Sequence, residues 1–216
     1  MFQQGELKSL GVATGLIILN IAVMWIFAFT PLSTINNLLF DTFFLLGVVV
    51  YGALLTGGVA LAKRGIRNDD RKLAVGGAGL VQFAYGIFGA GILGMVAPQA
   101  QAVALGITAV ITTIIAVLSG LLVYGTGHDF SSWGRYANYI FLGVLGISLV
   151  GSFSGPFILL AFALALIGFI VYLVHEIYQV KTRPGRPFLN GIGVYVAFMG
   201  VFVQILQLVI QMLLEE

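Results

Sequence analysis

The ten Lys and Arg residues of this chain all fall on one side of a membrane if its long apolar stretches are membrane crossings. A crossing helix needs about 20 residues, and seven stretches approach or exceed that length. They run at 10–29, 38–62, 73–96, 102–124, 137–153, 157–178 and 188–213. The basic residues are Lys8; Lys63, Arg64, Arg67, Arg71 and Lys72; Arg135; and Lys181, Arg183 and Arg186. A wrong number of crossings would scatter these charges over both sides, so their partition predicts seven.

Composition excludes a water-exposed globular surface. Of the 216 residues, 60% are hydrophobic and 8% are charged, whereas soluble domains carry about 25% charged residues. Lipid must therefore cover most of the chain, and we expect a single all-α transmembrane domain over residues 1–216. Its longest expected connection, 125–136, is too short for a soluble domain. A net charge of only +2, without a basic stripe, argues against a nucleic-acid partner.

The side that carries the basic residues predicts the orientation. Cytoplasmic loops of membrane proteins collect Lys and Arg, so we expect the N-terminus inside and Glu215 and Glu216 outside. This arrangement favours a multi-pass protein of the inner or plasma membrane, with the basic segment 63–72 as a cytoplasmic loop.

The last apolar stretch carries a stripe of small and amide residues along one helix face, because its members are spaced by three or four positions. They are Asn190, Gly193, Ala197, Gly200, Gln204, Gln207 and Gln211. An amide side chain that faces hydrocarbon leaves its donors and acceptors without partners, which costs roughly several kcal/mol of free energy. We therefore expect this stripe to face protein or water. Two interpretations stay open: hydrogen bonds between helices, worth roughly 0.6 kcal/mol per contact, or the lining of a polar path.

The sixth apolar stretch has a comparable face, with small residues at its outer end and Tyr172, Glu176 and Gln179 at its inner end. Glu176 is the carboxylate expected within a crossing, and His175 lies beside it. An ionisable residue at membrane depth is a hypothesis for a functional site. The alternative is that Glu176 lies at the inner boundary and pairs with Lys181 or Arg183. Asp41 is interpreted as an interfacial residue at a helix start.

Glycine spacing indicates close helix packing elsewhere. Gly11 and Gly15 are four residues apart, as are Gly86, Ala90 and Gly94. Small residues at this spacing let helix backbones approach one another in lipid, and we interpret both sets as packing positions.

Motifs for metal binding or catalysis are weak. His128 and His175, with Asp129 and Glu176, form a candidate metal or proton-sensing cluster, but ordinary loop histidines are the favoured interpretation. The absence of cysteine excludes disulfides and thiolate metal sites. Residues 151–155 read GSFSG, with Phe153 where a nucleophile-elbow serine would stand. We therefore expect neither an enzyme nor a cofactor, and leave any metal open.

The second half of the chain resembles the Bax inhibitor-1 family of seven-span membrane proteins. The similarity lies in LLVYGTGHDFSSWGRY (121–136), IFLGVLGISLVGSF (140–153), VYLVHEIYQVK (171–181) and VYVAFMGVFVQIL (194–206). Asp129, Phe130, Ser131 and Gly134 match the family's polar loop after the fourth span. The text around Gln179 matches the end of its sixth span, and the similarity covers about residues 105–213.

The resemblance implies a seven-helix bundle with a central seventh helix and a proton-sensitive cation path, usually described as a calcium leak. In the family, an acid near the end of span six pairs with an acid in span seven. Here Glu176 falls at the first acid, but Ala197 falls at the second. The carboxylate pair is therefore absent, which argues against a pH switch and tight calcium binding.

Two functions follow. The first is a leak-type membrane protein with low flux of Ca²⁺ or H⁺, in which His175, Glu176 and the 190–211 stripe line the path. The second is a non-transporting regulator or assembly partner, whose basic inner loops, 63–72 and 181–187, bind another membrane protein or anionic lipid.

Overall fold

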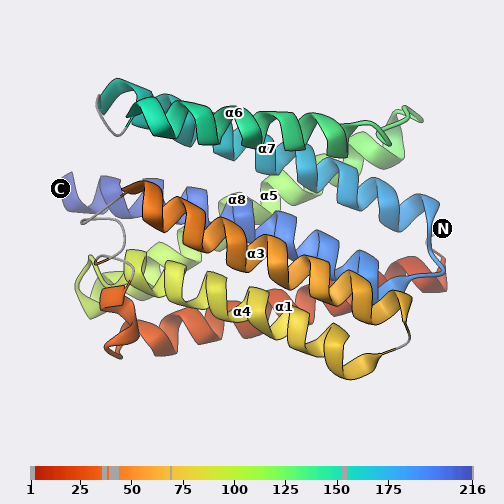
Figure 1. Ribbon diagram of the computed structural model, residues 1–216, viewed down its shortest axis with the longest axis horizontal. Helices are drawn as coiled ribbons and strands as arrows, with labels where there is room; N and C mark the ends of the chain where they lie inside the picture. The colour runs from red at the N-terminus through yellow and green to blue at the C-terminus, as the bar shows by residue number, and fades with distance from the viewer. Residues whose placement is uncertain (1–2, 36–37, 39–43, 69, 152–154, 216) are drawn as a thin grey trace. The chain divides into compact units, whose positions relative to one another are not determined.

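The computed structural model describes residues 3–35, 38, 44–68, 70–151 and 155–215. Asp41 and Phe153 lie outside the described residues. All regular structure in the described ranges is helical (Figure 1). The helices are α1 (Gln4–Ala28), α3 (Phe44–Arg67), α4 (Arg71–Leu93), α5 (Pro98–Gly125), α6 (Trp133–Gly151), α7 (Gly155–Thr182) and α8 (Pro187–Glu215).

Six of these helices are long and apolar enough to cross a membrane. The segments are Gln4–Ala28, Val49–Arg67, Arg71–Leu93, Pro98–Gly125, Leu159–Thr182 and Pro187–Glu215. The prediction of an all-α, multi-pass membrane protein is therefore confirmed. The stretch expected at 137–153 does form a helix, α6, but this helix is not among the six.

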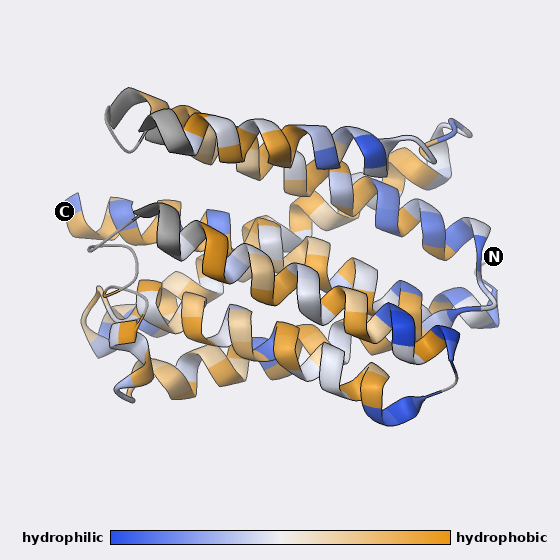
Figure 2. Ribbon diagram, viewed as in Figure 1, coloured by the Kyte–Doolittle hydropathy of each residue, from blue (hydrophilic) through white to orange (hydrophobic). Residues whose placement is uncertain are grey.

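Helix α5 has one buried face, and its other faces expose apolar residues. Its buried positions form one stripe that is mainly small or polar: Gln101, Ala104, Thr108, Thr112, Ser119 and Val123. Its other faces expose large apolar residues such as Val110, Leu118 and Leu121. Figure 2 shows hydrophobic residues along the helices. Hydrophilic residues gather where α3 ends and α4 begins. A helix that exposes its apolar side is built for lipid rather than water.

The contacts of the chain fall into two compact units. The first comprises Met1–Ala13 and Gly106–Ile205, and the second comprises Thr14–Leu105 and Leu206–Glu216. The two polar stripes of α5 and α8 therefore run through parts of both units, whereas the C-terminal ends of α5 and α7 and the N-terminal end of α8 belong to the first.

Within the second unit, α3 and α4 pack with their backbones almost touching. A Cβ on Gly58, Gly65 or Gly77 would overlap atoms of the facing helix, including backbone atoms of Ala62 and Ala74. Only glycine permits this approach, which small residues at helical spacing make possible in lipid.

Helix α1 packs on the opposite small face of α4. A Cβ on Gly86 would press on Val23, and one on Gly89 would press on Met24. The packing role predicted for Gly86 is confirmed. The same role was wrong for Gly11 and Gly15, because both are exposed and a Cβ at either would meet nothing within 4 Å.

Within the first unit, α6 lies along α7. Gly168 of α7 faces Ile140 and Phe141 of α6, and the Phe141 and Phe169 rings lie 4.8 Å apart. Helix α8 is the most buried of the six candidate crossings, with 78% of its apolar window buried.

Candidate functional site

Glu176 points from α7 toward α8. A Cβ on Gly193 would overlap the Glu176 carboxylate, so a larger residue at position 193 would make the carboxylate shift. Lys181, a partner considered for Glu176, is used elsewhere: its ammonium group donates to the Val123 carbonyl at 2.9 Å and lies 5.1 Å from the Tyr124 ring centre. Glu176 is therefore a half-buried acid held against the next helix.

His175 occupies the neighbouring position and holds the connection between α5 and α6. Its Nδ1 lies 3.0 Å from the Phe130 carbonyl oxygen, and its Nε2 lies 3.3 Å from the Gln179 amide nitrogen. A neutral ring with its proton on Nδ1 satisfies both, donating to the carbonyl and accepting from the amide. The ring also stacks with Tyr172, centre to centre 6.4 Å. Three of the predicted site residues are thus brought together.

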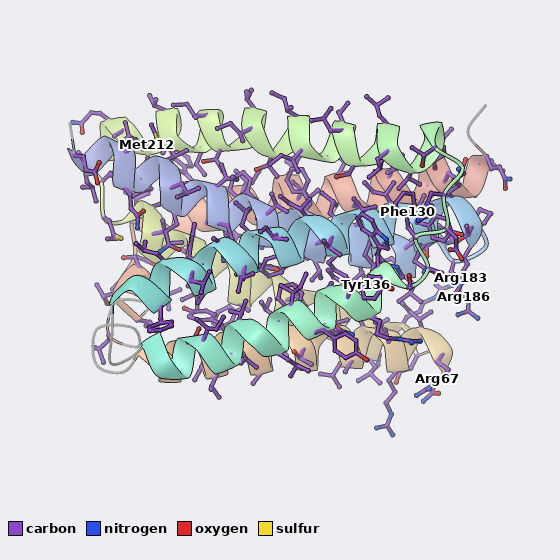
Figure 3. The ribbon with its side chains drawn as sticks, turned by 90° about the horizontal axis from the view of Figure 1, so that it is seen from above. Arg67, Phe130, Tyr136, Arg183, Arg186 and Met212 are labelled. Carbon is purple, nitrogen blue, oxygen red and sulfur yellow. The ribbon has the colours of Figure 1, made fainter. Side chains whose placement is uncertain are left out.

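Phe130 anchors that connection. It is 2% exposed although it lies between two helices, and Figure 3 shows it against α7. Its ring makes edge contacts with His128, Trp133 and Tyr178. A Cβ on Gly134 would press on the His175 ring, so glycine at 134 lets the connection close on α7. The connection is also shorter than expected, since α6 already begins at Trp133.

Asp129 fixes the backbone on the other side of Phe130. Its carboxylate accepts from the Ser131 backbone N–H at 2.8 Å and from the Ser131 hydroxyl at 3.1 Å. These bonds, with one from the Tyr178 hydroxyl, hold the pKa of Asp129 below its ordinary value. The residues that carry the family resemblance in this loop therefore build an anchor rather than a ligand cluster.

The N-terminal part of the α8 stripe has a structural role. The Asn190 amide donates to the Arg183 carbonyl at 2.8 Å and so holds the turn that leads into α8. Farther along, Ala197 is fully buried, and a Cβ on Gly200 would overlap the Phe169 ring. The stripe is thus closely packed at Gly193 and Gly200.

The C-terminal part of the α8 stripe contains a buried polar atom that lacks a partner in the described part of the chain. Gln204 is half-buried, and its side-chain oxygen is buried with no hydrogen-bond partner among the described residues. Gln207 is half-buried and Gln211 is exposed. On α5, the hydroxyl oxygens of Thr108 and Thr112 are also buried without such a partner, and both residues are fully buried. Buried polar atoms of this kind cost about 1–3 kcal/mol each, and they commonly mark a site for water, an ion or a ligand.

The remaining predicted residues separate from this cluster. All five basic residues of the 63–72 segment are exposed at the ends of α3 and α4, where Asp70 caps α4 by accepting from the Leu73 N–H at 3.0 Å. In the part of the chain that the structure describes, no group of three or more His, Asp and Glu residues could hold a metal ion.

Sequence reasoning missed a second buried acid. Glu6, in the first turn of α1, is 4% exposed. Its carboxylate accepts from the Tyr124 hydroxyl at 3.1 Å and from the Gln3 backbone N–H at 2.5 Å. The available signal was its spacing from Ser9 and Ala13, which places all three on one helix face.

A buried amide pair was also missed. Asn20 of α1 donates to the side-chain oxygen of Gln82 at 2.5 Å and to the Gln82 carbonyl at 2.9 Å. The Gln82 amide in turn donates to the Leu16 carbonyl at 2.8 Å. These bonds join α1 to α4, as polar residues commonly do between crossing helices.

No protein-family model, no curated protein and no solved structure matches this chain.

Proposed function

We propose that this protein is a divergent relative of the Bax inhibitor-1 family that gives a low leak of cations across a cell membrane. The observation that carries the proposal is the position of Glu176, a half-buried acid on a crossing helix whose carboxylate faces Gly193 of α8. Ionisable side chains within crossing helices are rare and commonly belong to ion or proton routes.

The proposal includes seven crossings around α8. Helix α6 has 19 residues, which gives a length of about 28 Å at 1.5 Å per residue. The contacts of Gly168 with Phe141 and of Gly134 with His175 run α6 alongside α7, so α6 would cross with it. Burial of α8 supports its central place, and the partition of basic residues supports an N-terminus inside.

In this account the path is closed at rest. Gly193 and Gly200 are covered by Glu176 and Phe169, so an ion passes only when α7 and α8 separate slightly. The Glu176 carboxylate then attracts a cation, such as Ca²⁺ or H⁺, at the inner end. The unpaired oxygens of Thr108, Thr112 and Gln204 supply only neutral polar groups farther along the path, so the flux through the path is correspondingly low.

Ala197 accounts for an expected difference from the family. Two acids that share a proton change their charge state with pH because one of their pKa values is raised, but the sequence has no acid between 188 and 213, and Ala197 stands where the second acid of the family falls. We therefore expect the leak to vary little with pH. Ala197→Asp should introduce a pH dependence between pH 5 and 8, and flux that stays flat would contradict this alignment.

The experiment is ion flux in liposomes that contain the purified chain, compared with protein-free liposomes, for Ca²⁺, Na⁺, K⁺ and H⁺ in turn. Slow flux of at least one cation above the protein-free rate is the expected result. No flux for any of them would remove the leak function.

A second candidate is a non-transporting membrane regulator. The exposed basic segment 63–72 favours it, because unpaired charges at a membrane surface suit an acidic partner protein. Crosslinking in native membranes tests it: a partner that is lost on neutralising Arg67 and Arg71, in a chain without flux, would favour the regulator.

A further inference from the structure

The turn between α7 and α8 contains a depression of about 380 Å³ lined by Arg183, Gly185 and Arg186. All three residues are exposed, and Figure 3 shows the two arginines side by side at this end of the first unit. A Cβ on Gly185 would meet nothing within 4 Å, so the glycine leaves the floor of the depression open.

The two arginines have no competing partner. Among the described residues, Arg183 and Arg186 form hydrogen bonds only through their backbone atoms. Two guanidinium groups without a carboxylate partner repel one another, and an anion between them would relieve that repulsion. Guanidinium groups match the geometry of phosphate oxygens, to which they donate paired hydrogen bonds.

The backbone of the turn is fixed in advance. The Arg186 N–H donates to the Arg183 carbonyl at 3.3 Å, and the Asn190 amide donates to the same carbonyl at 2.8 Å. Helix α8 then begins at Pro187 and runs for 29 residues. Its first N–H groups and its dipole add positive potential at the turn.

The turn also lies where phosphate groups are concentrated. It has only four residues, 183–186, between two candidate crossings, so both arginines are held close to the membrane surface. The cytoplasmic leaflet carries anionic lipids, which attract basic residues just outside a crossing.

We propose that this depression binds a phosphate group, with Arg183 and Arg186 as its two ligating side chains. The phosphodiester of an anionic phospholipid and free phosphate share this chemistry, and the experiment separates them. The site does not depend on ion conduction, so its test is independent of the test of the proposed leak.

The test uses native mass spectrometry of the full-length protein, released from phosphatidylcholine membranes with or without phosphatidylglycerol. Phosphorus NMR of added inorganic phosphate forms the second arm. Arg183→Gln with Arg186→Gln removes the ligands, and Gly185→Leu fills the depression while keeping both charges. Arg135→Gln is the matched control, because it removes an exposed positive charge from the start of α6, outside both basic loops.

We expect wild type to retain phosphatidylglycerol in preference to phosphatidylcholine. Each lost arginine should weaken retention roughly fivefold, the factor for about one surface basic residue, and Gly185→Leu should weaken it as well. Arg135→Gln should leave it unchanged. If wild type instead binds inorganic phosphate with the same variant pattern and shows no lipid preference, free phosphate is the ligand. The site is overturned if the variant without both arginines behaves as wild type, or if Arg135→Gln weakens binding equally.

Discussion

Glu176 and Gly193 face one another so closely that a single added carbon at position 193 would overlap the carboxylate. This pair joins the acid of α7 to the polar face of α8. The contact can therefore be tested by a measurement of stability, because any residue larger than glycine at 193 must displace Glu176.

Gly193→Ala should therefore push the Glu176 carboxylate away from α8 and destabilise the protein by about 1 kcal/mol, the low end of the cost of extra volume in a packed site, because the end of a flexible side chain can shift. Thermal unfolding in detergent measures it. Gly143→Ala is the control, since a Cβ there meets nothing within 4 Å, and it should be neutral or slightly stabilising. Equal stability of the two variants would mean that Glu176 does not pack on α8.

Phe130→Ala should cost about 3–5 kcal/mol, as for other buried Phe to Ala changes, because the ring fills the contact among His128, Trp133 and Tyr178. Limited proteolysis should then cut the connection between α5 and α6. Tyr136→Ala removes a neighbouring aromatic ring that is 53% exposed and should change little. A resistant Phe130→Ala chain would refute the anchoring role.

The anchor should also be insensitive to mild acid. The Ser131 N–H lowers the pKa of Asp129 below the ordinary 3.8, so the stabilisation from its ionised form is present above that value and is lost only as pH falls below it. The protection factor for hydrogen exchange at Ser131, relative to the unfolded chain at the same pH, should therefore be constant from pH 5 to 8. A protection factor that falls within this range would contradict the role given to Asp129.

The crossings were predictable because the hydropathy of a crossing is averaged over about twenty residues, so that a few polar residues do not hide it. Their ends were not, since α1 starts at Gln4 and α7 runs to Thr182, where helix continues past the apolar part. Polar residues such as Glu6 were overlooked because only a partner distant in sequence, Tyr124, explains their burial.

The candidate site was predictable in part for the same reason. Helical spacing placed Tyr172, Glu176 and Gln179 on one side of α7, and the contacts with Gly193 and His175 fit that placement. The loop anchor was not predictable, because nothing in the local sequence shows that Phe130 turns inward. Spacing likewise failed for Gly11 and Gly15, since a small residue permits an approach but does not require one.

The orientation has a direct test, because the chain has no cysteine and each introduced one is unique. Glu215→Cys should react with a membrane-impermeant maleimide on intact cells. Asn68→Cys, in the basic turn between α3 and α4, should react only after the membrane is opened. The reverse pattern, or reaction of both on intact cells, would contradict the seven-crossing arrangement.

Cation flux in liposomes that contain the Glu176→Gln variant tests the central claim most directly. Glu215→Gln is the control, because it loses the same charge at the end of α8. The account predicts that flux falls about fivefold in Glu176→Gln, which corresponds to ~1 kcal/mol for one attractive charge in water-like surroundings, and stays unchanged in Glu215→Gln. Equal flux in wild type and Glu176→Gln would contradict it.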